Sequence, residues 1–236
     1  MSVIKDTPLE DKIQTIRQFS QFMQIDYEYL EPLVSAAVPF EFMRGDLIFR
    51  EHDLPKFLYI VQKGRVKCFK QSGTGRNFVA YVASHGGSLN GIAVFSGLPH
   101  FLTAQAIETT MLLRIKREDF VPIVTQDQKP LIGMILSMEQ ALRSSYDRLI
   151  DAVGERASQR VCDVLYMLRG KFGPELHFSG EEIAELSGTT TETTIRILST
   201  LKRQKIIDSD RRIIRILNDI ELKNMSHFPE HSPGRA

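Results

Sequence analysis

The chain of 236 residues has no tryptophan and only two cysteines, Cys68 and Cys162, which stand far apart and form no CxxC pair. Two cysteines cannot build a disulfide framework, nor can they supply the four thiolates of an iron–sulfur cluster. Cys68 falls in a strand-like segment, so we expect it to be a small filler of the core.

A charge of one sign is also lacking, because 30 basic and 29 acidic residues leave a net charge of +1. Any nucleic-acid surface must therefore be a local patch. No apolar run approaches the roughly 18 residues that span a bilayer, and the first residues contain no secretory hydrophobic segment. Together with the sparse cysteines, these absences predict a cytoplasmic protein with no membrane partner.

What is present falls into stretches of different period. Residues 9–37 have the pattern of short helices, with Asp26 as an N-cap and Leu30, Leu33 and Ala37 on one face. Between residues 40 and 120, short β-rich runs alternate with glycine-bearing turns; the runs are 47–49, 58–61, 66–69, 78–82 and 112–115. This spacing predicts an antiparallel sandwich or barrel.

A heptad pattern follows over residues 128–153. Its seam positions, alternately four and three residues apart, are Leu131, Ile135, Met138, Leu142, Ser145, Leu149 and Ala152. A period of 3.5 favours a two-chain coiled coil, and therefore a homodimer. The alternative is a long helix packed on its own domain. Gly154 would end this helix and act as a hinge.

These boundaries divide the chain into four parts. Residues 1–127 form the β-rich domain with its N-terminal helices, 128–153 the dimerisation helix, 154–225 a second domain, and 226–236 a disordered tail. The expected fold class is α+β.

A helix-turn-helix pattern occupies residues 179–208. Ser179 and Glu182 form a capping box that opens one helix. Gly188 follows where a tight turn needs positive φ. Thr189 or Thr190 caps a second helix, with Glu192 completing another box. Ile195, Leu198 and Leu201 would hold this second helix on the core.

The outward face of the second helix carries groups that read DNA. Hydroxyls near a helix N-terminus suit phosphate oxygens, Glu192 can accept from cytosine, and Arg196 can fork onto guanine. Residues 196–215 hold seven basic and two acidic residues. A β-wing over residues 211–217 would follow a turn at 208–210. The DNA-binding residues predicted are Ser179, Thr190, Thr191, Glu192, Thr193, Arg196, Lys202, Arg203, Arg211 and Arg212.

The alternative for Glu192 and Arg196 is an exposed salt bridge at i,i+4 spacing. The surrounding capping box, turn glycine, apolar spacing and wing favour DNA contact instead. The sequence therefore predicts a winged helix-turn-helix domain that binds double-stranded DNA.

The helix-turn-helix residues align without a gap to those of the CRP/FNR superfamily of transcription regulators. This superfamily is named after the cyclic-AMP receptor protein and the fumarate-nitrate regulator. The residues that carry the resemblance are Ser179, Glu182, Ile183, Ala184, Gly188, Glu192, Thr193, Arg196, Leu198, Leu201, Ile206 and Ile207. Residues 44–49 and 58–66 resemble that family's opening hairpins. The resemblance covers roughly residues 15–225. It implies an N-terminal β-roll sensor of cupin-like, double-stranded β-helix form, a palindromic operator, and RNA polymerase as a further partner.

The chain departs from the family in its effector cassette. Residues 90–104 resemble the stretch where cyclic-nucleotide binders carry Glu for the ribose and an Arg-Ser pair for the phosphate, but here Gly91, His100 and Phe101 occupy those positions. The cysteine cluster of FNR-type oxygen sensors is also missing. Thr191 stands where relatives of the cyclic-AMP receptor carry an arginine, which implies a half-site with one guanine fewer, near TTGA.

The resemblance and the apolar cassette imply an effector pocket for a small molecule other than cyclic AMP, with an apolar or aromatic small acid as the first candidate. Its expected lining is Tyr81, Leu89, Gly91, Ile92, Val94, His100, Phe101, Leu102, Leu142, Ser145 and Tyr146. Haem is a second candidate, with His85 or His100 as its axial ligand. We expect no other metal.

Two functions from other classes fit the sequence less well. A metal enzyme on a cupin-like roll would need clustered His and Glu ligands, and no HxH motif with a matched Glu is present. A regulatory ligand-binding module without DNA conflicts with the wing and the outward face of the second helix. The sequence favours a homodimeric, allosteric transcription regulator with no catalytic residues.

Overall fold

The computed structural model describes residues 2–3, 8–22, 30–73, 75, 77–126, 128–154 and 156–226. The expected N-cap Asp26 and residues 227–236 of the expected tail lie outside these ranges. The chain forms two compact units, one of Met1–Ser72 and Val79–Leu142, the other of Gly73–Phe78 and Arg143–Ala236.

The first unit is an antiparallel β-roll of two four-stranded sheets. One sheet has the order β1 (Ser2–Val3), β2 (Val38–Phe42), β8 (Thr110–Lys116), β4 (Phe57–Lys63). The other has the order β3 (Leu47–Phe49), β7 (Thr103–Ala106), β5 (Val66–Gln71), β6 (Asn77–Ala83). All five strand-like runs found in the sequence are confirmed as strands, and the α+β fold class holds.

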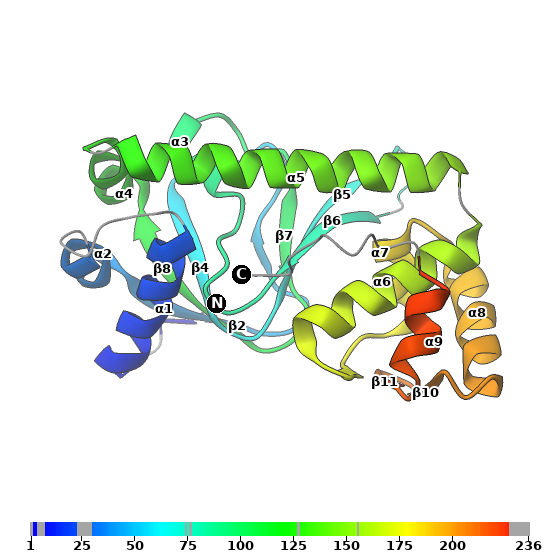
Figure 1. The fold of residues 1–236 in the computed structure, drawn as a ribbon. Coiled ribbons are helices and arrows are strands. Elements are labelled where there is room, and N and C mark those ends of the chain that lie inside the picture. The colour runs from blue at the N-terminus through cyan, green and yellow to red at the C-terminus, as the bar shows by residue number, and fades with distance from the viewer. Residues whose placement is uncertain are drawn as a thin grey trace. The chain divides into compact units, whose positions relative to one another are not determined.

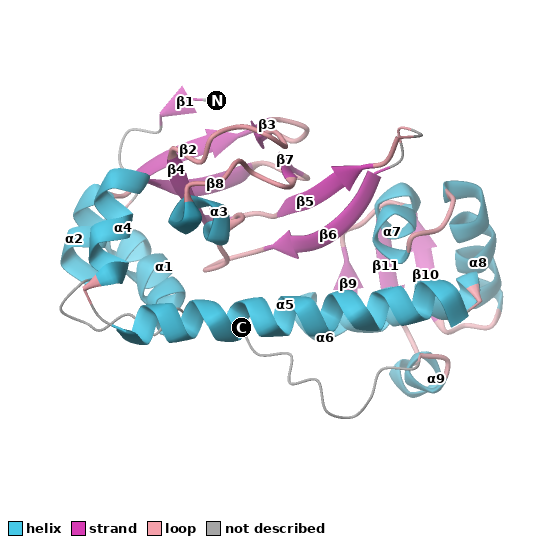
Figure 2. Ribbon diagram, turned by 90° about the horizontal axis from the view of Figure 1, so that it is seen from above, coloured by secondary structure: helices cyan, strands magenta, loops and turns pink. Residues whose placement is uncertain are grey.

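Helices cover one face of the first sheet. They are α1 (Leu9–Phe22), α2 (Leu30–Ala36), α3 (Gly91–Ser96) and α4 (Arg117–Thr125). Figure 2 shows α1, α2 and α4 gathered at one end of the strands. Alternation along β4 explains the packing, because Leu58 and Ile60 enter the core beneath these helices while Tyr59 and Val61 face the interior of the roll.

A single uninterrupted helix, α5 (Gln128–Gly154), follows the roll (Figure 1). The expected helix over 128–153 and its end at Gly154 are confirmed. In the described ranges, no helix combines the length and the apolar character that crossing a membrane requires.

The remainder of the second unit is a winged helix-turn-helix. Its elements are α6 (Ala157–Phe172), β9 (Glu175–Leu176), α7 (Gly180–Ser187), α8 (Thr191–Arg203), β10 (Ile207–Asp210), β11 (Ile213–Ile216) and α9 (Asp219–Asn224). The three strands form an antiparallel sheet in the order β10-β11-β9. Val161, Leu165 and Leu168 of α6 are buried against this core.

Candidate nucleic-acid interface and ligand site

The capping box that opens α7 is confirmed. The Ser179 hydroxyl accepts a hydrogen bond from the Glu182 backbone N–H at 3.2 Å, and Glu182 Oε2 accepts from the Ser179 N–H at 2.6 Å. Ile183 and Ala184 of α7 are buried. The start of the helix is therefore fixed by its own side chains, and its apolar face is fixed by the core.

The turn between α7 and α8 has a left-handed residue, Gly188, with φ of 63°, as expected. Beside it runs a chain of hydroxyls that the sequence did not reveal. Ser187 Oγ lies 3.0 Å from Thr189 Oγ1, which lies 2.5 Å from Thr194 Oγ1. Thr194 is fully buried. This chain ties the turn to the first turns of α8.

Thr190 is the N-cap of α8, because its hydroxyl accepts from the Thr193 N–H at 3.2 Å. The second capping box expected with Glu192 does not form, since a cap at Thr190 puts Thr193 rather than Glu192 at the third helical position. Leu198 and Leu201 are buried as expected, whereas Ile195 is 53% exposed. The residue that packs inward in its place is Thr194.

Ile195 lines a shallow cavity of about 260 Å³ between α8 and the wing. Phe178, Leu198 and Ile214 line it as well. Ile195 thus lies on the flank of α8 that faces the wing, and its expected place in the core was wrong.

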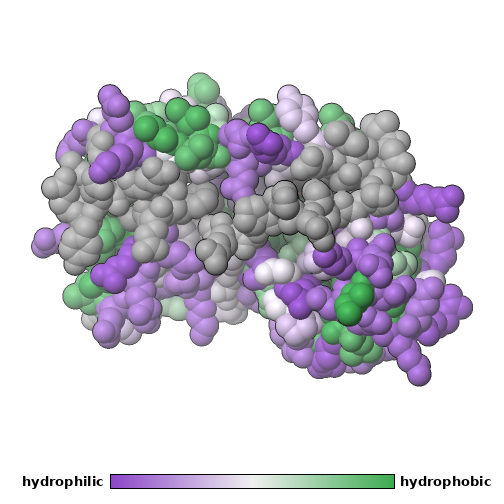
Figure 3. All heavy atoms as spheres, in the orientation of Figure 1, coloured by the Kyte–Doolittle hydropathy of each residue, from purple (hydrophilic) through white to green (hydrophobic). Residues whose placement is uncertain are grey.

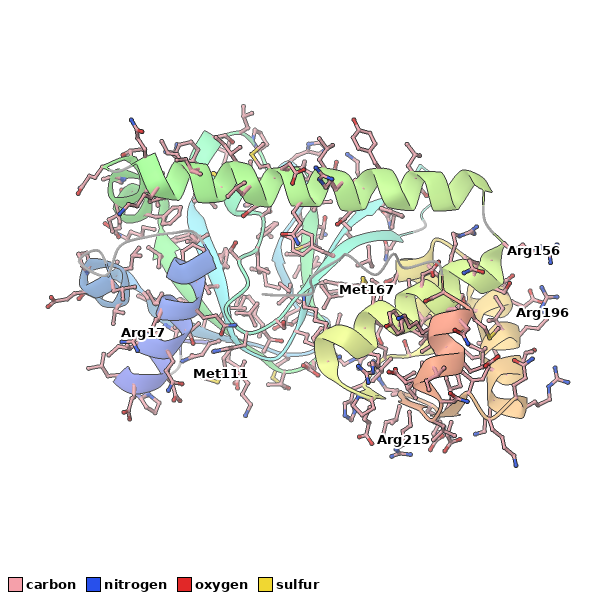
Figure 4. The ribbon with its side chains drawn as sticks, viewed as in Figure 1. Arg17, Met111, Arg156, Met167, Arg196 and Arg215 are labelled. Carbon is pink, nitrogen blue, oxygen red and sulfur yellow. The ribbon has the colours of Figure 1, made fainter. Side chains whose placement is uncertain are left out.

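The polar face of α8 is open to solvent. Thr191, Glu192 and Arg196 are exposed and Thr193 is half-buried. Arg196 extends away from the domain (Figure 4). Within the described ranges no ion pair joins Glu192 to Arg196, so the alternative of an i,i+4 salt bridge receives no support.

The wing is the hairpin of β10 and β11. Asp210 pairs with Ile213, which leaves Arg211 and Arg212 as a two-residue turn. The turn expected at residues 208–210 was therefore misplaced, because those residues belong to β10. Alternating Ile207, Ile214 and Ile216 along the strands sets this register by burying one face, and the turn carries two adjacent arginines to the tip.

Three of the seven basic residues between 196 and 215 are paired. Lys202 Nζ lies 2.8 Å from Asp208 Oδ1, Arg215 Nε lies 2.9 Å from Glu175 Oε2, and Arg212 Nη2 lies 3.0 Å from Glu182 Oε1. The hydrogen bond and charge of Lys202 hold the pKa of the Asp208 carboxyl below its usual range. The other four of these seven residues enter no ion pair in the described ranges; they are Arg196, Arg203, Lys205 and Arg211.

The cassette of the β-roll contains a buried histidine. His100 is 2% exposed, its ring stacks on Phe49 with centroids 3.7 Å apart, and its Nδ1 lies 3.1 Å from Asn90 Nδ2. Burial lowers the pKa of His100, although the nearby Asp53 charge opposes this. The imidazole is therefore a neutral ring at neutral pH.

A second polar contact lies beside this histidine. The Tyr81 hydroxyl accepts from the Asn90 N–H at 2.8 Å, and it is also hydrogen-bonded to the Cys68 thiol. Burial raises the pKa of Cys68 to about 12, which keeps the thiol protonated. Cys68 is fully buried, so its expected role as a core filler is supported.

The expected pocket residues do not all come together. Leu89 and Leu102 are buried in the interior of the roll, with Tyr81 packed against them. Val94 and Ile92, in contrast, pack into the core beneath α1 and α4. Residues 91–96 coil into α3, whose apolar side faces the helices, so the place of these two residues in a pocket stays a prediction.

The remaining expected pocket residues are open to solvent or carry no side chain. The side chain of Phe101 is 52% exposed, so it does not occupy the interior of the roll, where a ligand would bind. A Cβ at Gly91 would lie 3.3 Å from Ser88 Oγ, which leaves little room on that side. Leu142, Ser145 and Tyr146 are exposed on α5.

The seam of α5 is an apolar stripe without a cover. Ile135, Met138, Leu142 and Leu149 are each between 46% and 63% exposed, Ser145 is exposed and Leu131 is half-buried. Hydrophobic residues gather over the N-terminal half of α5 in Figure 3. A helix packed on its own domain would bury this stripe. Among the large apolar side chains of α5 that the structure describes, only Met134 is buried in the core of the domain.

The two histidines considered as haem ligands already have partners. His85 Nδ1 lies 2.8 Å from the Gln62 carbonyl oxygen, and His100 Nδ1 contacts Asn90. In the part of the chain that the structure describes, no three His, Cys, Asp or Glu side chains are grouped to hold a metal ion.

Comparison with known proteins matches both units to protein families. Residues 39–127 match a cyclic nucleotide-binding domain, and residues 159–225 match a Crp-like helix-turn-helix domain. The cyclic AMP receptor protein of Thermus thermophilus is 29% identical over 70% of this chain and 76% of its own length. The transcriptional activator protein Anr of Pseudomonas protegens is 24% identical over 84% of this chain and 83% of its own.

Solved structures show the same fold. FixK2 from Bradyrhizobium japonicum superimposes with a TM-score of 0.74 at 24% identity, covering 82% of this chain and 98% of its own. The c-di-GMP responsive regulator CLP of Xanthomonas campestris gives a TM-score of 0.69 at 16% identity, covering 81% and 99%.

Proposed function

Because the chain belongs to the CRP/FNR family of transcription regulators, which are not enzymes, we propose that it works as a homodimer on a two-fold symmetric DNA site under the control of a small effector. The observation that carries this proposal is the placement of α8. Thr190, Thr194 and Leu201 fix one side of that helix, and its opposite face presents Thr191, Glu192 and Arg196 to solvent.

The proposed DNA contacts divide by chemistry. Arg196 and Glu192 lie near the start of α8, where a recognition helix meets base edges, and they suit guanine and cytosine. Hydroxyls and exposed cations suit phosphate oxygens. The proposed phosphate contacts are Ser179, Thr190, Thr191, Thr193, Lys202, Arg203 and Arg211. The Lys202 ammonium pairs with Asp208 and donates to the Ser209 carbonyl oxygen at 2.7 Å, but both side chains of the pair are about half exposed, so a phosphate can compete for it.

The proposed dimer rests on the uncovered stripe of α5. Exposed Ile135, Leu142 and Leu149 recur at heptad spacing, and a second copy of the same helix buries them by knobs-into-holes packing. A two-fold dimer presents two copies of α8 to successive turns of the DNA major groove.

The proposed effector is a small molecule other than cyclic AMP. A cyclic phosphate brings a full negative charge, which needs a guanidinium and a hydroxyl when it is buried. In the cassette, His100 is neutral and stacked, Phe101 points to solvent, and Gly91 has no side chain for a ribose. These residues do not fit a cyclic nucleotide, and they support a less phosphate-like ligand that shifts the balance between two dimer states.

Selection from a random pool of DNA duplexes tests this proposal. We expect the full-length protein to recover palindromes with half-sites about 10–10.5 base pairs apart, centre to centre. Recovery of asymmetric single half-sites would contradict the homodimer. Recovery of no sequence at all would contradict DNA recognition. RNA polymerase, the further partner proposed, is tested by transcription from a promoter that carries the selected site.

A further inference from the structure

Arg211 and Arg212 are neighbours in the two-residue turn of the wing, and their side chains lie in different surroundings. Arg212 Nη2 lies 3.0 Å from Oε1 and 3.2 Å from Oε2 of Glu182, thirty residues earlier in the chain. Arg211 is exposed and forms no ion pair in the described ranges. The wing therefore touches the start of α7 through one arginine and leaves the other in solvent.

The carboxylate that holds Arg212 is itself fixed. Glu182 is 9% exposed, and its Oε2 also accepts the Ser179 N–H at 2.6 Å. The pairs Lys202–Asp208 and Arg215–Glu175 differ, because both partners of each are about half exposed. Breaking an exposed pair returns two charges to water, whereas removing Arg212 leaves a buried carboxylate without its cation.

We propose that Arg212 is a positioning residue that clamps the wing to the capping box of α7, and that Arg211 is the wing's contact to the DNA phosphates. This rests on the proposed function, since it assigns roles within the same DNA-binding domain. The clamp couples two elements from separate parts of the sequence, because the pair of Glu182 and Arg212 joins the tip of the hairpin of β10 and β11 to the N-terminus of α7.

The salt dependence of DNA binding separates a phosphate contact from a positioning residue. The probe is the duplex that the wild-type protein selects. Each phosphate contact contributes a slope of about −0.9 to log K against log salt, so Arg211→Ala should make the slope shallower by about 1.8 in a dimer. Arg212→Ala should weaken binding but leave the slope unchanged. If Arg212→Ala also made the slope of log K against log salt shallower by about 1.8, Arg212 would be a phosphate contact and the clamp would be overturned.

Hydrogen exchange without DNA provides a second measurement on the full chain. Arg212→Ala and Glu182→Gln should each speed exchange of the wing amides in residues 207–216 by more than the roughly fivefold that an exposed pair would give, because Glu182 is buried. The double variant should go no further, because both changes break the same contact. Gln keeps an acceptor for the Ser179 N–H, so Glu182→Gln leaves the capping box in place.

Arg211→Ala is the matched control and should leave wing exchange unchanged. Additive effects of Arg212→Ala and Glu182→Gln would overturn the clamp even if DNA binding behaves as expected. A wild-type protein that selects no duplex would contradict the proposed function alone, because the exchange coupling is measured without DNA.

Discussion

The imidazole of His100 lies face to face with the ring of Phe49, with centroids 3.7 Å apart and ring planes 10° apart. Stacking covers one side of the imidazole, and Asn90 meets Nδ1 at its edge. A cyclic phosphate would need a cation at this position of the cassette, and the structure has a neutral aromatic pair instead.

We expect cyclic AMP to bind no more tightly than about 1 mM, which corresponds to roughly −4 kcal/mol. The reason is that the buried phosphate charge would have neither a guanidinium nor a hydroxyl partner. Isothermal titration calorimetry on the full-length protein measures this directly. Micromolar binding together with a matching gain in affinity for the selected duplex would show that cyclic AMP is the effector.

Acidification should destabilise the sensor through His100. Burial lowers the pKa of His100 in the folded protein, so the unfolded chain, with an ordinary histidine pKa of about 6.5, binds the proton more readily. The free energy of unfolding therefore keeps the full contribution linked to His100 above about pH 7 and decreases as the pH drops through about 6.5. Urea unfolding midpoints at pH 8 and pH 5.5 should show a smaller loss in His100→Gln than in the wild type.

The exposed His52 is a matched control for this pH effect. Its side chain is 84% exposed and its backbone N–H donates to the His100 carbonyl oxygen, so His52→Gln controls for the loss of a histidine from the same loop. An equal loss in His100→Gln and the wild type would contradict the assignment to His100.

Leu142→Asp should break the dimer and abolish operator binding together. A carboxylate at a seam position stays solvated only if the two helices separate. Sedimentation velocity reports the oligomeric state, and a gel shift reports DNA binding. Gln140→Asp puts the same charge at an exposed position of α5 away from the seam and should remain dimeric. If Leu142→Asp also remains dimeric, the seam is not the interface.

Arg196→Ala should cost about 1–3 kcal/mol of binding free energy and relax the preference for one G·C pair in each half-site. Repeating the random-site selection with the variant measures this. Arg203→Ala, a change to an exposed cation in the last turn of α8, should instead weaken all sequences alike. A uniform loss in Arg196→Ala would reduce Arg196 to a phosphate contact. The wild-type half-site should be close to TTGA.

Local signals made the helix-turn-helix predictable. Ser179, Glu182, Gly188 and the apolar positions of α7 and α8 each act within a few residues of sequence, so spacing alone identifies them. Long-range partners were not predictable. The contact between Glu182 and Arg212 spans thirty residues, so no local pattern indicates it. The bond between Thr189 and Thr194 is local, but Thr194 takes the buried place that the apolar spacing assigned to Ile195.

The sequence also did not predict three elements whose residues are unusual for a strand or a helix. Strand β2 contains Pro39, which argues against a strand, and α4 contains Pro122 within the helix. Tertiary packing overrides both, because β2 is held by β8 and Phe120 of α4 is buried under the sheet. Helix α3 has only six residues and begins after Asn90 in a left-handed conformation, a start that carries no regular capping pattern.

The unbroken length of α5 converts small rotations into large displacements. At 1.5 Å per residue, 27 residues form a rod about 40 Å long. If such a rod tilts by about 5° at its first turn, its last turn moves by about 3.5 Å, which is close to the rise of one base pair along DNA. A change in the packing of Met134, which is buried near the start of α5, would therefore be enlarged at the other end of the helix to about one base-pair step.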